Sequence, residues 1–166
     1  MSAGGRHTAA VTESGELYVW GSGDACGVDE DVRTPIRVGG ALLGEQVVAV
    51  SAGAFHTAVL TAAGAVYTFG CGGEGQLGHG DRNSRKVPTL VGGALQGRVV
   101  VAVSAGVMTT AVVMQSGELY TFGKRFDYGE DGSTVPMLVV APLGKHCASV
   151  STAGYHMVAT TVDGAC

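Results

Sequence analysis

The stretch from Ser51 to Asp81, SAGAFHTAVLTAAGAVYTFGCGGEGQLGHGD, decides the fold, because imperfect copies of it lie upstream and downstream. It contains two short apolar segments separated by a glycine turn, and a glycine-rich loop follows the second segment. The second segment, residues 65–70, alternates β-branched and aromatic residues with a period of two, which is typical of a β-strand. The stretch therefore predicts two strands joined by a tight turn, and then a loop.

The first part of this stretch occurs four times, at intervals of 47 to 53 residues. Each copy begins with a serine, and the four are Ser2, Ser51, Ser104 and Ser151. Five residues later come His7, His56, Thr109 and His156. A glycine closes the apolar segment of each copy, at Gly15, Gly64, Gly117 and Gly164. Self-similarity at a fixed period indicates a repeat architecture.

The rest of each unit is a variable loop, a proline and a final apolar segment. Pro35, Pro88 and Pro136 each precede a valine by three residues and a leucine by seven. No segment sustains a helical i, i+3, i+4, i+7 pattern, so we expect essentially no helix. About four short strands per unit of this length are typical of a β-propeller blade. We therefore predict an all-β fold, a partial β-propeller of four-stranded antiparallel blades. Small residues such as Ala52 and Gly53 are expected to let neighbouring sheets approach closely near the axis.

Several pieces of the unit, in this order, carry a family resemblance. VYTFG at 66–70, GQLGHGD at 75–81, Val87-Pro88 and SAGAFHT at 51–57 resemble the regulator of chromosome condensation repeat. The resemblance covers nearly the whole chain. The first copy departs from the pattern with GSGDACGVDED at 21–31, and the third with GKRFDYGEDG and with threonine in place of histidine.

The resemblance implies blades at about 16–64, 65–117 and 118–164, preceded by the tail of an earlier blade at 2–15. On this division, the stretch 51–81 spans the junction of two blades. Three blades and a terminal strand pair cannot close a ring, because propellers typically have 4–8 blades. We therefore expect an open arc that is a segment of a longer propeller. Its open edges are expected to pair with the remaining blades of the parent chain or with other copies, so that the isolated chain self-associates.

Composition excludes several classes of protein. The net charge of −4 over 166 residues argues against a broad nucleic-acid-binding surface, which needs clustered lysine and arginine. The four cysteines are irregularly spaced, which favours a reducing compartment over a disulfide framework. The N-terminus lacks the apolar region of a secretory signal, and the longest apolar run, 99–103, is far too short to span a bilayer. We expect an intracellular protein, cytoplasmic or nuclear, without membrane insertion.

No motif predicts catalysis, a cofactor or a metal. Gly70, Gly72 and Gly75 match a dinucleotide fingerprint, but the residues that follow do not begin a helix, so a blade loop explains them. The histidines at the repeated position lie on different units, and we expect imidazoles hydrogen-bonded to neighbouring backbone rather than zinc ligands. Cys71 and His79 flank one loop but offer only two ligands. Trp20, Phe69 and Phe122 share one slot and are expected to fill the blade core.

Function is therefore expected in the loops where the copies differ. Acidic loops could steer a basic partner. The candidate partner-binding residues are Asp24, Asp29, Glu30, Asp31, His79, Asp81, Arg82, Arg85, Lys86, Asp127, Glu130 and Asp131. We predict a non-enzymatic scaffold for protein–protein interaction. The resemblance leaves two alternatives open: nucleotide exchange on a Ran-type small GTPase, and substrate recruitment within a large ubiquitin ligase. The family's exchange factor uses an insertion in one blade, which these loops lack.

Overall fold

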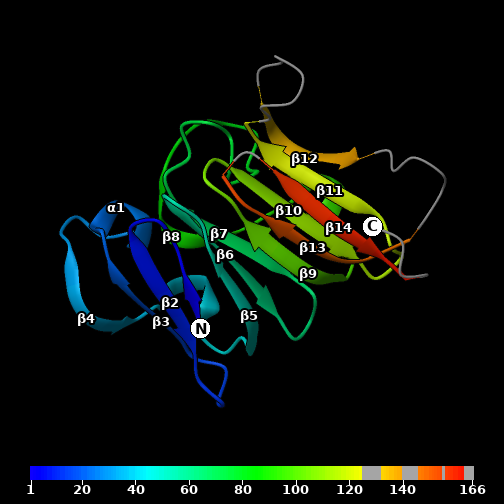
Figure 1. The fold of residues 1–166 in the computed structure, drawn as a ribbon. Helices are drawn as coiled ribbons and strands as arrows, with labels where there is room; N and C mark the ends of the chain where they lie inside the picture. The colour runs from blue at the N-terminus through cyan, green and yellow to red at the C-terminus, as the bar shows by residue number, and fades with distance from the viewer. Residues whose placement is uncertain (125–131, 140–145, 155, 163–166) are drawn as a thin grey trace.

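The computed structural model describes residues 1–124, 132–139, 146–154 and 156–162, and its architecture is all-β (Figure 1). Sheet 1 consists of β1 (Ser2–Ala3), β2 (His7–Val11), β3 (Leu17–Gly21) and β4 (Val32–Arg37). Sheet 2 consists of β5 (Val47–Ala52), β6 (His56–Thr61), β7 (Val66–Gly70) and β8 (Arg85–Leu90). Sheet 3 consists of β9 (Val100–Ala105), β10 (Thr109–Met114), β11 (Leu119–Gly123) and β12 (Ser133–Val139). Sheet 4 is the pair β13 (Cys147–Thr152) and β14 (Met157–Thr161).

The four sheets follow one another in chain order and form an open arc. Every pairing within a sheet is antiparallel between strands consecutive in sequence. Figure 1 shows sheet 1, in blue, at one end of the row and sheet 4, in orange and red, at the other. Three four-stranded sheets and a strand pair confirm the predicted partial propeller. No helix in the described part of the chain is long and apolar enough to cross a membrane.

The division into blades drawn from the repeat is offset from the sheets. The expected boundary at residues 64 and 65 falls within the β6–β7 hairpin, where His56 pairs with Gly70 and Leu60 with Val66. The stretch 51–81 therefore contributes to one sheet rather than to the junction of two, and residues 2–15 belong to a complete sheet. The physical reason is the tight turn at Gly64, which makes the strands on its two sides hydrogen-bonding partners.

Short helical turns interrupt the loops, which corrects the expectation of essentially no helix. α1 (Gly23–Cys26) is one turn long, and the 3-10 helices η1 (Gly40–Leu42) and η2 (Gly93–Leu95) lie between sheets. Such turns are too short to produce a periodic apolar pattern, so the sequence does not announce them. The repeated Leu42 and Leu95 are buried in the inter-sheet core, whereas the third leucine, Leu143, lies outside the described residues.

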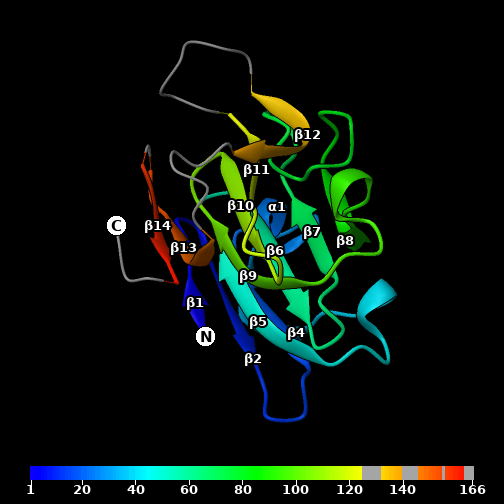
Figure 2. The same cartoon turned by 90° about the vertical axis from the view of Figure 1, so that its right-hand side faces the viewer.

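Neighbouring sheets meet most closely at their first strands, which adjoin one another along the inside of the arc (Figure 2). The repeated serine makes the same contact three times: Ser2, Ser51 and Ser104 Oγ accept the backbone N–H of the next sheet, from Ala52, Ala105 and Thr152 at 3.0, 2.9 and 2.8 Å. Glycine follows because a Cβ on Gly53 would overlap the carbonyl of Gly106. The expected close approach of small residues is confirmed.

A histidine–threonine pair joins sheets 1 and 2, and the next two sheets likewise. His7 Nε2 lies 2.8 Å from Thr57 Oγ1, and His56 Nε2 lies 2.8 Å from Thr110 Oγ1. Thr57 donates its proton to the carbonyl of Ala25, 3.3 Å away, so it accepts the Nε2–H proton of His7. The partner is thus a side chain of the next sheet, not the neighbouring backbone expected from the sequence.

Both imidazoles are deeply buried, and this disfavours their charged form. Desolvation lowers the pKa of His7 to about 4. Desolvation, with added repulsion from His7, lowers the pKa of His56 to about 3. The Nδ1 atoms of both rings are buried without a hydrogen-bond partner among the described residues. These histidines are therefore neutral structural links between sheets at physiological pH.

Candidate partner-binding face

The variable loops share one face of the arc. Each of the three loops that follow the third strand of a sheet begins beside the turn between the first two strands of that sheet. Three equivalent backbone hydrogen bonds fix this arrangement: Ser22 N to Arg6 O, Cys71 N to Phe55 O and Lys124 N to Met108 O, at 2.8, 2.9 and 2.9 Å. The inner turns and the outer loops therefore form a single surface, which we call the loop face.

The inner turns present a row that sequence reasoning missed, made of Arg6, Phe55 and Met108. These residues precede the repeated histidine or threonine and occupy the same position in their repeats. Arg6 is exposed, and Phe55 and Met108 are half-buried. The guanidinium carbon of Arg6 lies 5.0 Å from the centre of the Phe55 ring, a cation–π contact between two sheets. The available signal was variation: a cation, an aromatic and a thioether stand inside an otherwise repeated motif.

Cys71 lies beside this row, at the start of the second loop. Burial raises the pKa of its thiol, the carboxylate of Asp24 raises it further, and Arg6 acts in the opposite direction. These electrostatic couplings bring Asp24 from the first loop close to the inner row. Cys71 is a free, half-buried thiol held in its protonated form at neutral pH.

The first loop carries the acidic candidates, and they have different environments. Asp24 is exposed in the single turn of α1, and Glu30 is exposed beyond it. Asp31 Oδ1 accepts the backbone N–H of Gly23 at 3.0 Å and so closes the loop. Asp29 forms an ion pair with Lys86 of β8, which ties the first loop to sheet 2. Asp24 and Glu30 are the two carboxylates of this group directed to no printed partner within the described chain.

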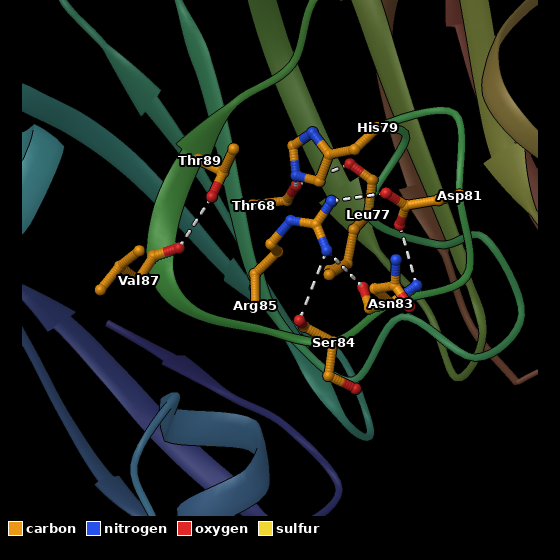
Figure 3. Close-up of polar contacts among 9 residues, drawn as sticks. All are labelled: Thr68, Leu77, His79, Asp81, Asn83, Ser84, Arg85, Val87 and Thr89. Atoms are coloured by element: carbon orange, nitrogen blue, oxygen red, sulfur yellow. Dashed lines mark hydrogen bonds and ion pairs between the residues drawn. The ribbon is translucent and has the colours of Figure 1, made fainter.

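The second loop is organised by its own polar residues (Figure 3). Asp81 Oδ2 accepts from Arg85 Nη2 at 2.7 Å, and Asp81 Oδ1 accepts the backbone N–H of Asn83 at 2.8 Å. These hydrogen bonds, that from Arg85 foremost, lower the pKa of the Asp81 carboxyl. His79 Nε2 lies 2.9 Å from Thr68 Oγ1, and burial is the main cause of its lowered pKa. His79, Asp81 and Arg85 thus hold the loop in shape.

A charged group bridges the second and third loops. Glu74 Oε2 lies 3.8 Å from Arg82 Nη1 and 3.9 Å from Lys124 Nζ. Arg82 also donates to the carbonyl of Gly73 at 3.2 Å and remains exposed. The acidic candidates of the third loop, Asp127, Glu130 and Asp131, lie outside the described residues.

The glycine-rich segment that matches a dinucleotide fingerprint is a packing element. A Cβ on Gly78 would lie 2.8 Å from the ring of Phe122, and its φ of +78° is a conformation that favours glycine. The carbonyl of Gln76 accepts the hydroxyl proton of Thr110 at 2.8 Å. The loop is thus pressed against sheet 3. In sheet 1, Ala25 takes the role of Gln76 although the two loop sequences differ.

The loop face holds no evident catalytic or metal centre in the part of the chain that is described. No cluster of three or more histidine, cysteine, aspartate or glutamate side chains with ligand geometry occurs there. Cys26, Cys71 and Cys147 are free thiols, and burial, aided by Asp31, raises the pKa of Cys26 to about 11. What the face offers is a row of mixed chemistry flanked by charged loops, which suits recognition of another protein.

Open arcs of four-stranded sheets with inner-strand contacts define this molecule as a β-propeller repeat protein. Family models of the regulator of chromosome condensation (RCC1) repeat match residues 63–113 and, in a second version, residues 1–28 and 47–76. The chain belongs to the RCC1 repeat family. The resemblance seen in the sequence is confirmed.

Relatives and solved structures place the chain within longer proteins. The E3 ubiquitin-protein ligase HERC2 of Mus musculus is 35% identical over 174 residues, covering 99% of this chain and 4% of the ligase. The ultraviolet-B receptor UVR8 of Arabidopsis thaliana is 34% identical over 176 residues, covering 99% of this chain and 39% of the receptor. The structure of Prp20p from Saccharomyces cerevisiae superposes with a TM-score of 0.82 at 21% identity, covering 95% of this chain and 42% of that one.

Proposed function

We propose that the chain is a non-enzymatic protein-interaction scaffold and that its loop face binds a protein partner. One observation carries this proposal: the inter-sheet contacts repeat from sheet to sheet, whereas Arg6, Phe55 and Met108 differ at one equivalent position of the loop face. Packing alone does not require a cation, an aromatic and a thioether at one exposed or half-buried position. Arginine, methionine and aromatic side chains are enriched in protein interfaces.

The charges of the loop face favour a partner with both signs of charge. The first loop presents the exposed carboxylates of Asp24 and Glu30, while Arg82 and Lys86 are exposed on the second loop and the strand after it. Lys86 is already paired with Asp29, so Arg82 is the stronger candidate for a contact with an acidic group. A partner would therefore place a basic group over sheet 1 and an acidic group over sheet 2.

An affinity-purification experiment with quantitative mass spectrometry tests this proposal. The bait is the chain itself, compared with the double variant Arg6→Ala/Phe55→Ala on the loop face. Glu13→Ala, an exposed change in the β2–β3 turn at the opposite end of the strands, is the matched control. We expect specific partners to be depleted with the double variant and retained with the control. Equal recovery with both variants would refute the loop face as the binding surface.

Substrate recruitment in a ubiquitin ligase is a more specific form of the same proposal. Its support is the 35% identity to mouse HERC2, a ligase of which this chain spans 4%. In this form the propeller supplies binding and a separate part of the parent chain supplies catalysis. Loss of the same partners from the parent ligase when it carries Arg6→Ala/Phe55→Ala, with unchanged autoubiquitination, is the expected result.

Nucleotide exchange is the alternative from a different class. The Prp20p structure was described with its binding to Gsp1p and histones, but its 21% identity supports the fold alone. Release of mant-GDP from a panel of Ran-type small GTPases separates the two functions. A scaffold leaves the release rate unchanged at saturating protein, whereas a marked acceleration would establish exchange activity and displace the scaffold proposal.

A further inference from the structure

The junction between consecutive sheets has two chemically distinct halves. The earlier sheet supplies a serine hydroxyl, a backbone N–H and a histidine; the later sheet supplies a backbone N–H, a carbonyl and a threonine. Between sheets 1 and 2 these contacts are Ala52 N to Ser2 Oγ, Gly5 N to Gly53 O, and His7 Nε2 with Thr57 Oγ1. Sheets 2 and 3 repeat all three contacts through Ser51, Ala54 and His56. The junction is therefore directional.

The two ends of the arc present these two halves unused. On sheet 4, Ser151 and His156 occupy the positions of the junction serine and histidine, and both are exposed. On sheet 1, Ala3 is exposed and Thr8 half-buried, and they correspond to Ala52 and Thr57. In contrast to their buried counterparts, the side chains of Ser151, His156 and Thr8 make no hydrogen bond within the described residues.

An apolar surface accompanies the polar groups at each end. Ala3, Thr8 and Trp20 lie opposite one another on three adjacent strands, forming one row across sheet 1. In sheet 2 the same row is Ala52, Thr57 and Phe69, and Phe69 is 0% exposed against the core of sheet 1. Trp20 in the same slot is only half-buried. This corrects the expectation that it fills the blade core.

The tail of the arc offers the complementary row. Ser151 pairs with Val158 across β13 and β14, so both side chains lie on the same face of sheet 4. Val158 is 58% exposed, whereas the equivalent Ala58 is 0% exposed beneath sheet 3. We call Ala3, Thr8 and Trp20 the head face, and Ser151, His156 and Val158 the tail face.

We propose that a second copy of this chain docks head to tail, with the tail face of one copy packed on the head face of the other. Continuity with the internal junctions argues for this occupant, because one chain carries both halves in the directional order that the junction requires. The match is fuller than at sheets 3 and 4, where Thr109 and Met157 replace the histidine and threonine. Such an interface is heterologous, so two copies bring eight sheets, within the number that closes propellers.

The sole tryptophan makes the interface directly observable, because Trp20 lies on the head face. Residues 1–166 are measured by light scattering coupled to size-exclusion chromatography and by tryptophan fluorescence over a concentration series. We expect the average mass to rise to at least that of a dimer, together with a blue shift of the Trp20 emission. A monomer at all concentrations, or association without any change in Trp20 emission, would overturn the proposal.

Two variants then test the direction of docking. Thr8→Arg blocks the head face and Val158→Arg blocks the tail face, and we expect each variant alone to be monomeric. Mixed together they retain one intact head and one intact tail, so a dimer forms and the Trp20 shift returns. Val87→Arg on β8, whose side chain is also 58% exposed, is the matched control and should associate like the parent.

Each remaining outcome has one meaning. Circular dichroism melts establish that both variants fold, and a variant that does not fold is replaced by Thr8→Glu or Val158→Glu. Association that survives Thr8→Arg indicates tail-to-tail docking and overturns the proposal. Association lost with Val87→Arg indicates pairing through the outer strands and overturns it as well. Assembly through the loop face is excluded if Arg6→Ala/Phe55→Ala associates normally, so this test is independent of the proposed function.

Discussion

The junctions between sheets 1 and 2 and between sheets 2 and 3 differ from that between sheets 3 and 4. All three retain the serine contact to the backbone of the next sheet. The first two add a buried histidine–threonine pair, whereas Thr109 of the third turns instead to the carbonyl of Lys124. The difference teaches that the serine–backbone contact sets the spacing of sheets, while the histidine adds a link that can be dropped from one junction without changing the architecture.

Acidification should break this comparison with the largest effect. The pKa values of His7 and His56 are lowered from 6.5 to about 4 and about 3, so below pH 6.5 the unfolded chain binds more protons than the folded one. Their stabilising contribution is complete above about pH 6.5 and is lost as the pH falls towards the folded values. Linkage gives a loss of about 2 kcal/mol for each histidine at pH 5. Urea unfolding between pH 7.5 and pH 5 measures it.

A histidine-free pair of junctions provides the control for this pH dependence. His7→Gln/His56→Gln should be less stable at pH 7.5 but nearly flat in stability between pH 7.5 and 5, apart from a smaller contribution of His79, whose pKa is also lowered. His156→Gln, at the exposed equivalent position, should keep the full dependence. An unchanged slope in the double variant would contradict the assignment. Asp81 and Glu118, with lowered carboxyl pKa values, lose their contribution only at lower pH.

Truncation at the equivalent positions of two junctions should give the next largest effect. His56→Ala removes a fully buried ring and one hydrogen bond of Thr110, which should cost about 3 kcal/mol. Thr109→Ala removes only a hydroxyl on a partly buried residue and should cost about 1 kcal/mol. Urea denaturation at pH 7.5 compares the two free energies of unfolding. Equal losses would show that the histidine adds nothing to its junction.

Installing the missing pair should sharpen the comparison with a small gain. Thr109→His/Met157→Thr places the histidine and threonine of the first two junctions at the third, where the serine contact already fixes the spacing. We expect a stabilisation of about 1 kcal/mol, the usual net contribution of one hydrogen bond. The single variants should each be destabilising, so a double-mutant cycle isolates the coupling. A coupling energy of zero would mean that sheet 4 does not adopt the geometry of sheets 1 to 3.

The strands were predictable because each is a local pattern. Alternation at 65–70 predicted β7, and the repeated valine-rich segments predicted β5, β9 and β13. The pairing of β6 with β7 in one sheet was assigned wrongly, because a sequence repeat has no intrinsic beginning and any division of it is periodic. Only the hydrogen-bonded register shows where one sheet ends. The one-turn helix α1 was missed because four residues produce no period.

The candidate site was predictable only in outline. Variation among the loops correctly directed attention to 22–31 and 71–86, but the structure uses Asp31, Asp81 and His79 to hold those loops in shape. Whether the remaining candidates bind a partner stays a prediction. The row formed by Arg6 and its counterparts was missed because neighbours in that row are about one repeat apart in sequence and adjacent only across sheets.

By itself, the sequence determined the repeat, its strands and turns, and its family, because these depend on residues within about 50 positions of one another. Only the tertiary structure decided which residues face the next sheet. The same slot buries Phe69 completely and leaves Trp20 half-buried, and the same histidine position is sealed at His56 and open at His156. The physical reason is that burial in a repeat protein comes from the neighbouring sheet, so identical motifs acquire different environments according to their place in the arc.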